Sequence, residues 1–307
     1  MVVPEDPMAR LERALDIASL SRGHRFLKRP WHLGSSKVME LALFRPPAVY
    51  GTTFWGDDLE LVFPDRVSLS IHRYGFFEAD ATSFLARYLQ PGMTFLDVGA
   101  HIGYFSALAR WRVGPEGLVH AFEPTPRTFD VLSRNLGAYP NVFFNRSAAA
   151  AKAGSASFVD YGPRLTAFNT MAATQNIAAT RLEEREVARA THEVIQIDTV
   201  MLDQYVTDHG LKVDCLKIDA EGSEADVLQG ASELLRREGP VVVLEVGDVG
   251  SAGETLASSE LVEKLTHFGY RPFECRRGHL VEHGLRRRYE HMNLIFLTDE
   301  HPLLASG

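Results

Sequence analysis

Short hydrophobic runs recur between residues 94 and 298, and most are separated by stretches whose apolar residues stand three or four positions apart. The runs predict strands and the spaced stretches predict amphipathic helices, so their alternation indicates βα units around a parallel sheet. The predicted strands are a run from Thr94 that ends in Asp97-Val98-Gly99, and Leu118–Glu123, Asn141–Ser147, Gly154–Asp160, Val194–Asp198, Val213–Asp219, Pro240–Gly247, Gly269–Cys275 and Tyr289–Thr298.

The helical pattern begins near the start of the chain, where residues 8–20 place apolar side chains on one face, as a packing helix does. Residues 50–74 instead form short β segments, with a hairpin turn predicted at Gly56-Asp57-Asp58. The predicted helices are Met8–Leu20, Gly75–Leu89, Tyr104–Trp111, Arg127–Leu136, Thr199–Tyr205, Ser223–Arg237 and Leu256–Phe268.

These patterns predict two regions. Residues 1–75 form a helical and β-hairpin extension, and residues 76–307 form a doubly wound α/β domain. Residues 161–192 break the βα rhythm with Gly-Pro, Asn-Thr and a charged run, and an insertion of this length is more often functional than idle.

The first predicted strand of the sheet leads into a glycine turn and a helix, with Asp97, Gly99 and Gly103 at the turn. Such a turn lets a ligand approach the backbone near the N-terminus of the next helix. A dinucleotide fingerprint that started at Gly99 would need glycines where His101 and Tyr104 stand, so that fingerprint fails. Glu123 closes the next apolar run, where a carboxylate can accept both ribose hydroxyls. An adenosine ligand without a pyrophosphate therefore fits best.

Three motifs now occur in order, each at the end of a predicted strand: the stretch from Asp97 to Tyr104, Ala121–Pro124, and Leu216–Glu224. Together they resemble the FkbM family of S-adenosylmethionine-dependent methyltransferases over residues of about 70 to 250. The chain departs from the family at His101, where Asn is usual. The resemblance implies a seven-stranded class I methyltransferase (Rossmann-like) sheet and transfer of a methyl group to a hydroxyl of a small molecule, commonly a sugar or natural product.

The resemblance also implies which residues meet S-adenosylmethionine, and implies that residues 161–192 form the acceptor-site insertion. Asp97 would attract the ammonium group, and Ser147 and Ala148 would hold the adenine, although Ser147 can equally be a plain strand end. For Glu78 an acidic residue at a helix start is the alternative. The full set is Tyr74, Glu78, Asp97, Gly99, Ala100, His101, Gly103, Glu123, Pro124, Ser147, Ala148 and Asp219.

Three acids are expected to converge at the C-terminal edge of the sheet: Asp219, Glu221 and Glu245. Such carboxylates repel one another unless a proton or a cation compensates them. Asp219 could act as a general base whose pKa its neighbours raise, the oxygens could hold Mg²⁺, or Lys217 could be a charge partner, while Asp219 and Glu221 could simply cap the next helix. The sequence favours a catalytic Asp219 without metal, because the Asp-x-Glu spacing does not match the metal-dependent relatives.

Histidines offer a second set of candidates. His101 in the glycine loop could cap the following helix, face the acceptor or point to solvent. His192, at the end of the insertion, is a comparable candidate for contact with the acceptor. His72 and His120 alternate with apolar neighbours, so we expect them to be structural.

The composition of the chain limits which classes of binding partner and which cellular location we expect. The formal net charge of −8 at pH 7 gives no indication of a nucleic-acid groove, and the basic run at residues 286–288 reads as a solvated tip, although it could contact an anionic acceptor. Cys215 and Cys275 stand far apart, which fits a reducing cytoplasm. No stretch has the length of a membrane span. We expect a cytoplasmic protein, and the sequence leaves open whether it forms a homodimer. A methyltransferase-shaped binding module without catalysis is the alternative function, but Asp97, Glu123 and Asp219 are all present.

Overall fold

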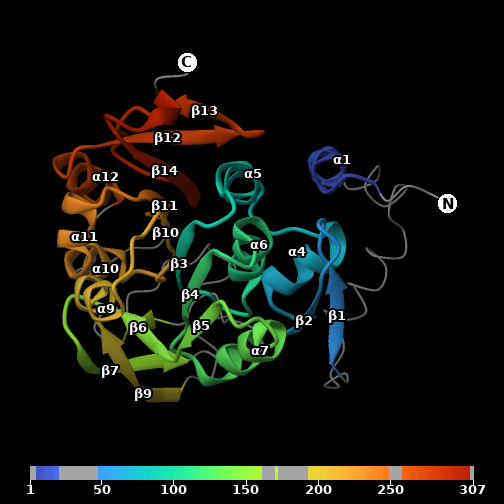
Figure 1. The fold of residues 1–307 in the computed structure, drawn as a ribbon, viewed down its shortest axis with the longest axis horizontal. Coiled ribbons are helices and arrows are strands. Elements are labelled where there is room, and N and C mark those ends of the chain that lie inside the picture. Colours follow the sequence, from blue (N-terminus) through green and yellow to red (C-terminus); the bar gives the residue numbers. More distant parts are fainter. Residues whose placement is uncertain (1–4, 21–47, 161–169, 172–192, 249–257, 305–307) are drawn as a thin grey trace.

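The computed structural model describes residues 5–20, 48–160, 170–171, 193–248 and 258–304, and a mixed sheet runs through its centre (Figure 1). The sheet has eight strands in the order β13-β12-β14-β11-β10-β3-β4-β5. Strands β11, β10, β3, β4 and β5 are parallel, while β14 runs antiparallel between β11 and β12. The predicted count of seven is wrong by one, because β13 forms a hairpin with β12 at one edge.

The strand bounds follow the predicted runs closely, and the inner strands are buried as their continuous apolar character indicates. The strands are β3 (Thr94–Val98), β4 (Leu118–Phe122), β5 (Val142–Asn145), β10 (Cys215–Ile218), β11 (Val241–Val246), β12 (Tyr270–Arg276), β13 (His279–Glu282) and β14 (Met292–Thr298).

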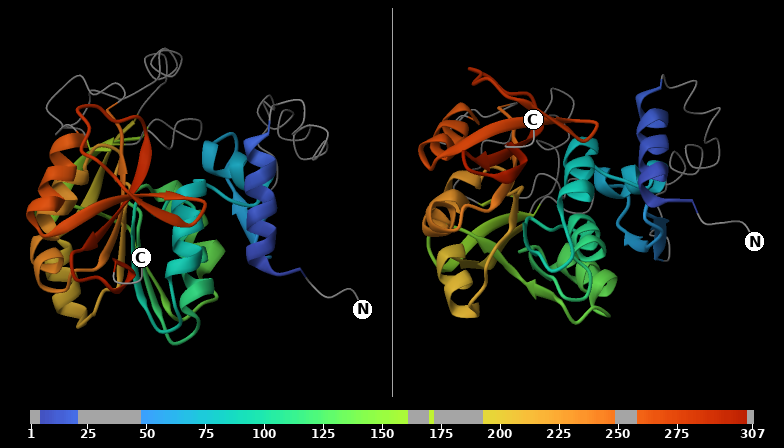
Figure 2. Two further views of the ribbon diagram at one scale, coloured as in Figure 1. Left: turned by 90° about the horizontal axis from the view of Figure 1, so that it is seen from above. Right: turned by 45° about the horizontal axis from the view of Figure 1, so that its top comes forward.

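Helices cover both faces of this sheet, and Figure 2 shows α5 and α6 on one side and α10, α11 and α12 on the other. The helices are α5 (Ala79–Tyr88), α6 (Tyr104–Val113), α7 (Pro126–Leu136), α9 (Leu202–His209), α10 (Glu224–Gly230), α11 (Ser232–Arg237), α12 (Ser258–His267) and the short 3₁₀ helix η3 (Pro302–Leu304). Within the described ranges, no helix is long and apolar enough to cross a membrane.

A second, four-stranded sheet has the order β6-β9-β7-β8. Its strands are β6 (Ser147–Ala149), β7 (Gly154–Asp160), β8 (Thr170–Met171) and β9 (Glu193–Val200). The single strand predicted over residues 141–147 is therefore two, because β5 ends at Asn145 and Ser147 pairs with Asp198 of β9 instead. Apart from β8, the predicted insertion at residues 161–192 lies outside the described residues.

The N-terminal part contains α1 (Pro7–Ser19), the hairpin β1 (Val49–Thr52) and β2 (Asp58–Leu61), and α4 (Arg66–Tyr74). The β character expected up to residue 74 is wrong for α4, which Asp65 caps by accepting the amides of Val67 and Ser68. Buried residues from this part share a hydrophobic core with α5, α6 and the sheet. The division at residue 75 stays a prediction.

The helix predicted over residues 223–237 is divided at Ala231 into α10 and α11. The carboxylate of Asp203 accepts the amides of Glu233 and Leu234 at 3.0 and 2.8 Å, and so caps the second helix. At the end of α10, a Cβ on Gly230 would lie 2.1 Å from the carbonyl oxygen of Ala150, so only glycine allows the helix to pack this closely.

Candidate functional site

A glycine loop joins β3 to α6 and lies against the ends of two neighbouring strands. Gly99 has a φ of +79°, and a Cβ there would lie 1.8 Å from the carbonyl oxygen of Asp219. The amides of Gly99 and Ala100 both donate to the carbonyl of Phe122 at 3.0 Å. Position 99 therefore requires glycine, and the loop is held between β10 and β4.

Asp97, near the end of β3, is completely buried. Its Oδ2 accepts a hydrogen bond from the Ser106 hydroxyl at 2.6 Å. Its Oδ1 has no hydrogen-bond partner among the described residues. Burial raises the pKa of this carboxyl, although Lys217 and Ser106 favour its ionised form. Because an unsatisfied buried acceptor costs free energy, Oδ1 is suited to a donor that a ligand supplies.

Glu123, which directly follows β4, connects the glycine loop to the start of α7. One carboxylate oxygen accepts the amide of His101 at 2.9 Å, and the other accepts the amide of Thr125 at 2.9 Å and the hydroxyl of Thr128 at 2.8 Å. These bonds give Glu123 a structural role, but each carboxylate oxygen has two lone pairs and can accept more than one donor. Ribose binding at Glu123 stays a prediction.

Strand register brings three polar residues into one row at the C-terminal edge of the parallel strands. Ile218 pairs with Leu244, so Asp219, the next residue, lies beside Glu245. Glu245 in turn pairs with Asn293 across the antiparallel β11–β14 ladder. Side chains of directly paired residues point to the same face of a sheet, so this row forms one side of the site.

A buried lysine lies beneath the row. Lys217 is 1% exposed, its Nζ lies 2.9 Å from Oδ2 of Asp219, and it stands 4.6 Å from the centre of the Phe105 ring. Burial opposes ionisation of Asp219, but the Lys217 charge and hydrogen bonds from Glu245 and Lys217 outweigh it and lower the pKa. The expectation of a raised pKa for Asp219 is wrong, because it considered the neighbouring acids and gave too little weight to the lysine.

The other two acids of the predicted cluster behave differently. Asp219, Glu221 and Glu245 each offer an oxygen within 4.8 Å of the others, so the structure brings the three carboxylates together. Burial, reinforced by the charge of Asp219, raises the pKa values of Glu221 and Glu245 well above the ordinary range. A raised pKa favours the protonated form, which lessens the repulsion among the three carboxyl groups.

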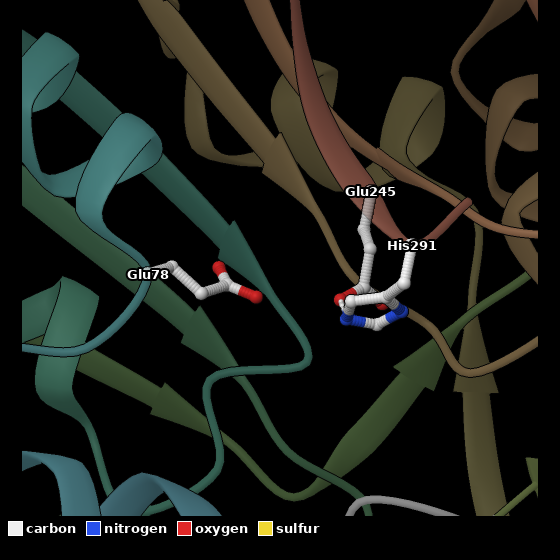
Figure 3. A group of neighbouring side chains, drawn as sticks. All are labelled: Glu78, Glu245 and His291. Carbon is white, nitrogen blue, oxygen red and sulfur yellow. Dashed lines mark ion pairs between the residues drawn. The ribbon is translucent and has the colours of Figure 1, made fainter. Parts of the chain in front are cut away.

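A second group joins this cluster through Glu245, and Figure 3 shows Glu78 pointing from the chain before α5 toward Glu245 and His291. Nε2 of His291 lies 2.7 Å from Oε1 of Glu245. Glu78 has a φ of +42°, and burial raises its pKa to about 7. Its Oε2 is buried and has no hydrogen-bond partner in the described part of the chain.

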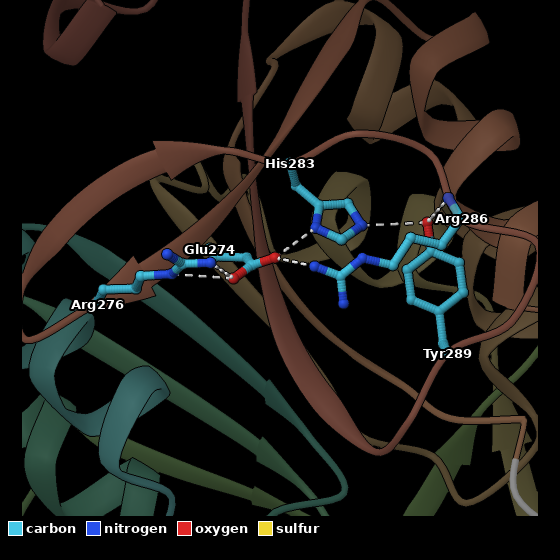
Figure 4. Close-up of polar contacts among 5 residues, drawn as sticks. All are labelled: Glu274, Arg276, His283, Arg286 and Tyr289. Atoms are coloured by element: carbon cyan, nitrogen blue, oxygen red, sulfur yellow. Dashed lines mark hydrogen bonds and ion pairs between the residues drawn. The ribbon is translucent and has the colours of Figure 1, made fainter.

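The segment that carries His291 is fixed by polar contacts (Figure 4). Nδ1 of His283 lies 2.8 Å from the carboxylate of Glu274, and its Nε2 lies 3.2 Å from the Tyr289 hydroxyl. The amide of Tyr289 donates to Oδ2 of Asp248 at 2.7 Å. These contacts hold the connection between β13 and β14, and so determine where His291 stands. Arg286, from the basic run expected to be solvated, also binds Glu274 at 2.5 Å.

The remaining predicted cofactor residues lie along neighbouring elements. Tyr74 ends α4, where its ring centre lies 6.0 Å from that of Phe76. Ser147 and Ala148 lie in β6, beside the end of β5. Pro124 follows Glu123 and is half-buried, and Gly103 precedes α6 with a φ of +89°.

Of the four histidines considered from sequence, three lie among the described residues. His120 stacks on Phe143 with ring centres 4.6 Å apart and lies 2.8 Å from the Tyr205 hydroxyl, as a structural residue does. His101 adopts a φ of +52°, and its amide binds Glu123. The rings of His72 and Phe63 are nearly perpendicular, with centres 5.9 Å apart, and His192 lies outside the described residues.

The sequence reasoning missed His291 and Asn293. His291 immediately precedes the long apolar strand β14, and Asn293 is the second residue of that strand. Because the two residues are two positions apart, strand alternation places their side chains on the same face. A polar pair at the start of an antiparallel strand was the available signal, because that end of β14 lies beside the C-terminal ends of the parallel strands.

Fold and site together define a methyltransferase-type protein. Five parallel strands, an antiparallel strand inserted between β11 and β12, and acids at the ends of β3, β4 and β10 form the arrangement of a class I methyltransferase. The model of the methyltransferase FkbM domain matches residues 97–272. The chain belongs to this family of methyltransferases.

Two curated relatives of this chain are named as methyltransferases. 31-O-demethyl-FK506 methyltransferase FkbM of Streptomyces tacrolimicus is 31% identical over 186 residues, covering 55% of this chain and 71% of that protein. Methyltransferase sdnD of Sordaria araneosa is 32% identical over 163 residues, covering 47% of this chain and 62% of that protein. The match to the AMB antimetabolite synthetase AmbE of Pseudomonas aeruginosa covers only 10% of that protein. The crystal structure of Methyltransferase FkbM from Methylobacillus flagellatus KT gives a TM-score of 0.44 at 14% identity, covering 74% of this chain and 52% of that one.

Proposed function

We propose that this methyltransferase uses S-adenosylmethionine to methylate a hydroxyl of a small molecule, a sugar or a natural product. The observation that carries the proposal is the buried Oδ1 of Asp97, which lacks a partner in the described residues beside a loop that only glycine can form. An ammonium group is the donor that best satisfies an ionised buried carboxylate.

Residues around the glycine loop fit an adenosine cofactor. Asp97 would hold the ammonium group, Glu123 the ribose hydroxyls, and Ser147 and Ala148 would lie near the adenine. S-adenosylmethionine supplies a methyl group on a positively charged sulfur, so its carbon–sulfur bond breaks as the new oxygen–carbon bond forms and S-adenosylhomocysteine leaves. The acids at the sheet edge favour that positive charge in the ground state, and Lys217 limits their repulsion.

The acceptor hydroxyl must lose its proton as the oxygen–carbon bond forms. We propose that Asp219 receives it, because Asp219 directly follows β10, its backbone carbonyl lies against Gly99 of the cofactor loop, and its carboxylate lies in the cluster with Glu221 and Glu245. Its ion pair with Lys217 keeps Asp219 ionised and therefore able to accept a proton, although a low pKa makes it a weak base. Glu221 and Glu245 lie beside Asp219 at the same edge of the sheet, and a hydrogen bond from Glu245 favours the ionised form of Asp219.

The acceptor class rests on the relatives. The name of one of them, 31-O-demethyl-FK506 methyltransferase, describes methylation at an oxygen of a natural product. This chain covers 71% of that protein, which supports the same type of acceptor here.

Calorimetry tests the cofactor. Wild-type protein should bind S-adenosylhomocysteine and not NAD, and Asp97→Asn should lose about 1.5–3 kcal/mol of binding free energy, at least tenfold in affinity. Binding of NAD alone would contradict the proposal, and unchanged affinity in Asp97→Asn would contradict the role of Asp97.

Transfer from methyl-labelled S-adenosylmethionine to a panel of hydroxylated natural products and sugars tests the reaction. If the labelled methyl group is found on an oxygen of the acceptor and is not released by base hydrolysis, the result supports O-methylation. Cofactor binding without transfer to any acceptor, in protein that also leaves S-adenosylmethionine unconsumed, would favour the inactive binding module.

A further inference from the structure

Glu78, Glu245 and His291 form a mixed group of one imidazole and two carboxylates (Figure 3). Each offers one ligand atom, and these atoms lie within 4.8 Å of one another. Ligands around a tetrahedral ion at 2.0–2.2 Å stand roughly 3.4 Å apart, so side-chain rotations that close the group by at most roughly 1.4 Å would bring all three ligand atoms to coordination distance of one ion. We propose that these three residues bind a divalent transition-metal ion such as Zn²⁺ or Mn²⁺.

Two buried acceptors, one within the group and one next to it, favour binding of a cation here. Oε2 of Glu78 and Oδ1 of Asn293 are both buried without a hydrogen-bond partner in the ranges that the structure describes. Asn293 is 7% exposed, pairs with Glu245 across the β11–β14 ladder and is a hydrogen-bond partner of Glu78. Two unsatisfied oxygens at one place indicate a bound positive group, since native proteins rarely leave such atoms unpaired.

The three ligands come from positions that the fold fixes. Glu245 is held in β11, and His291 precedes β14 in the segment that Tyr289 and Asp248 fix. Glu78 is held in a left-handed backbone conformation, in which its carbonyl accepts the amide of Thr82 at 2.9 Å. A non-glycine residue rarely adopts positive φ unless its surroundings require it, so the backbone here orients the carboxylate.

The neighbouring acids Asp219 and Glu221 are less suited to hold the ion. Oδ2 of Asp219 already binds Nζ of Lys217 at 2.9 Å, and a cation there would have to displace the ammonium group. The set with His291 has an imidazole that is exposed to solvent, which leaves an entry path for the ion. Imidazole suits zinc and carboxylates suit both zinc and manganese, whereas magnesium prefers oxygen ligands alone and usually keeps several waters.

Three protein ligands leave a coordination position open. If the proposed methylation of a hydroxyl is correct, the acceptor oxygen would occupy that position, and the ion would lower the pKa of the hydroxyl before the methyl group arrives. This role rests on the proposed function, whereas metal binding itself does not.

Calorimetry on tag-free, chelator-treated full-length protein tests the site with ZnCl₂, MnCl₂ and MgCl₂ in turn. We expect one Zn²⁺ or Mn²⁺ per chain, with Mg²⁺ at least tenfold weaker. His291→Ala and Glu245→Gln should each weaken Zn²⁺ or Mn²⁺ at least tenfold. His279→Ala is the matched control, because His279 is also exposed but lies in the β13 hairpin, and it should bind as wild type does.

Low-temperature electron paramagnetic resonance of bound Mn²⁺ gives a second readout. Nitrogen coupling in the wild type that disappears in His291→Ala supports coordination by the imidazole. Wild-type protein that binds neither ion, or binding that His291→Ala and Glu245→Gln leave unchanged, overturns the proposal. Binding of S-adenosylhomocysteine is measured on the same samples, so a failed metal site and a failed methyltransferase assignment give different results.

Discussion

Replacing Gly99 by alanine should disrupt the cofactor loop more than any ordinary glycine substitution. The new Cβ would lie 1.8 Å from the carbonyl oxygen of Asp219, whereas real Cβ contacts essentially never fall below 3.0 Å, so the loop or the end of β10 must move by more than 1 Å. Positive φ adds roughly 1–2 kcal/mol for a residue with a side chain. We expect the free energy of unfolding to fall by about 3–5 kcal/mol, comparable to severe core substitutions.

Gly92→Ala separates the two causes. Gly92 has a φ of +86°, similar to +79° at Gly99, but its Cβ would meet nothing within 4 Å. Urea unfolding of both variants should give a loss of about 1 kcal/mol for Gly92→Ala, and only Gly99→Ala should lose affinity for S-adenosylhomocysteine. Equal losses of stability and equal affinities in the two variants would refute the clash as the reason for glycine at position 99.

Three further changes test individual contacts. Lys217→Met should cost about 3–5 kcal/mol of unfolding free energy in urea, because it leaves Asp219 buried among carboxylates without its cation; a loss below 1 kcal/mol would contradict that pairing. Glu123→Ala should cost about 3 kcal/mol, since buried donors of the glycine loop and α7 lose their acceptor, and unchanged stability would show that these bonds are dispensable. Burial lowers the pKa of His120 to about 4 from 6.5, so protonation opposes folding, and stability should fall as the pH decreases from 6.5 toward 4. His120→Gln should lack this pH-dependent loss of stability, which is worth up to about 3 kcal/mol at pH 4. If the melting temperatures of the two proteins fall equally as the pH is lowered, this role of His120 is contradicted.

Most of the sheet could be predicted because its strands are short apolar runs bounded by turn residues. β3, β4, β10 and β11 each lie within the predicted range, and β14 returns antiparallel as expected. The spacing of apolar residues failed to predict secondary structure where capping contacts determine it. Residues 66–74 form α4 because Asp65 caps them, and the break at Ala231 depends on a cap from Asp203, a residue far away in sequence.

The site was predictable where acids stand at or near the C-terminal ends of predicted strands, as Asp219 and Glu245 do. The sequence predicted that Asp219 and Glu245 converge, but it did not predict the strand register, so the place of Asn293 beside Glu245 was not visible. The charge on Asp219 depends on the same register, because Lys217 reaches it only if the strand continues regularly to its end. A sequence shows which residues can ionise, but distances between strands determine which of them do.

The site concentrates carboxyl groups whose ionisation burial and mutual repulsion oppose. Glu78, Glu221 and Glu245 have raised pKa values, chiefly through burial, and Lys217 is the buried cation that pairs with Asp219. Glu78 and Glu221 also adopt positive φ, so backbone strain and charge repulsion occur together at this one edge of the sheet. A ligand that brings positive charge relieves the repulsion only in the folded state, and by linkage it must then stabilise the protein. The same carboxylates that lower the stability of the free protein would thus contribute binding free energy for a cationic methyl donor and for a metal ion.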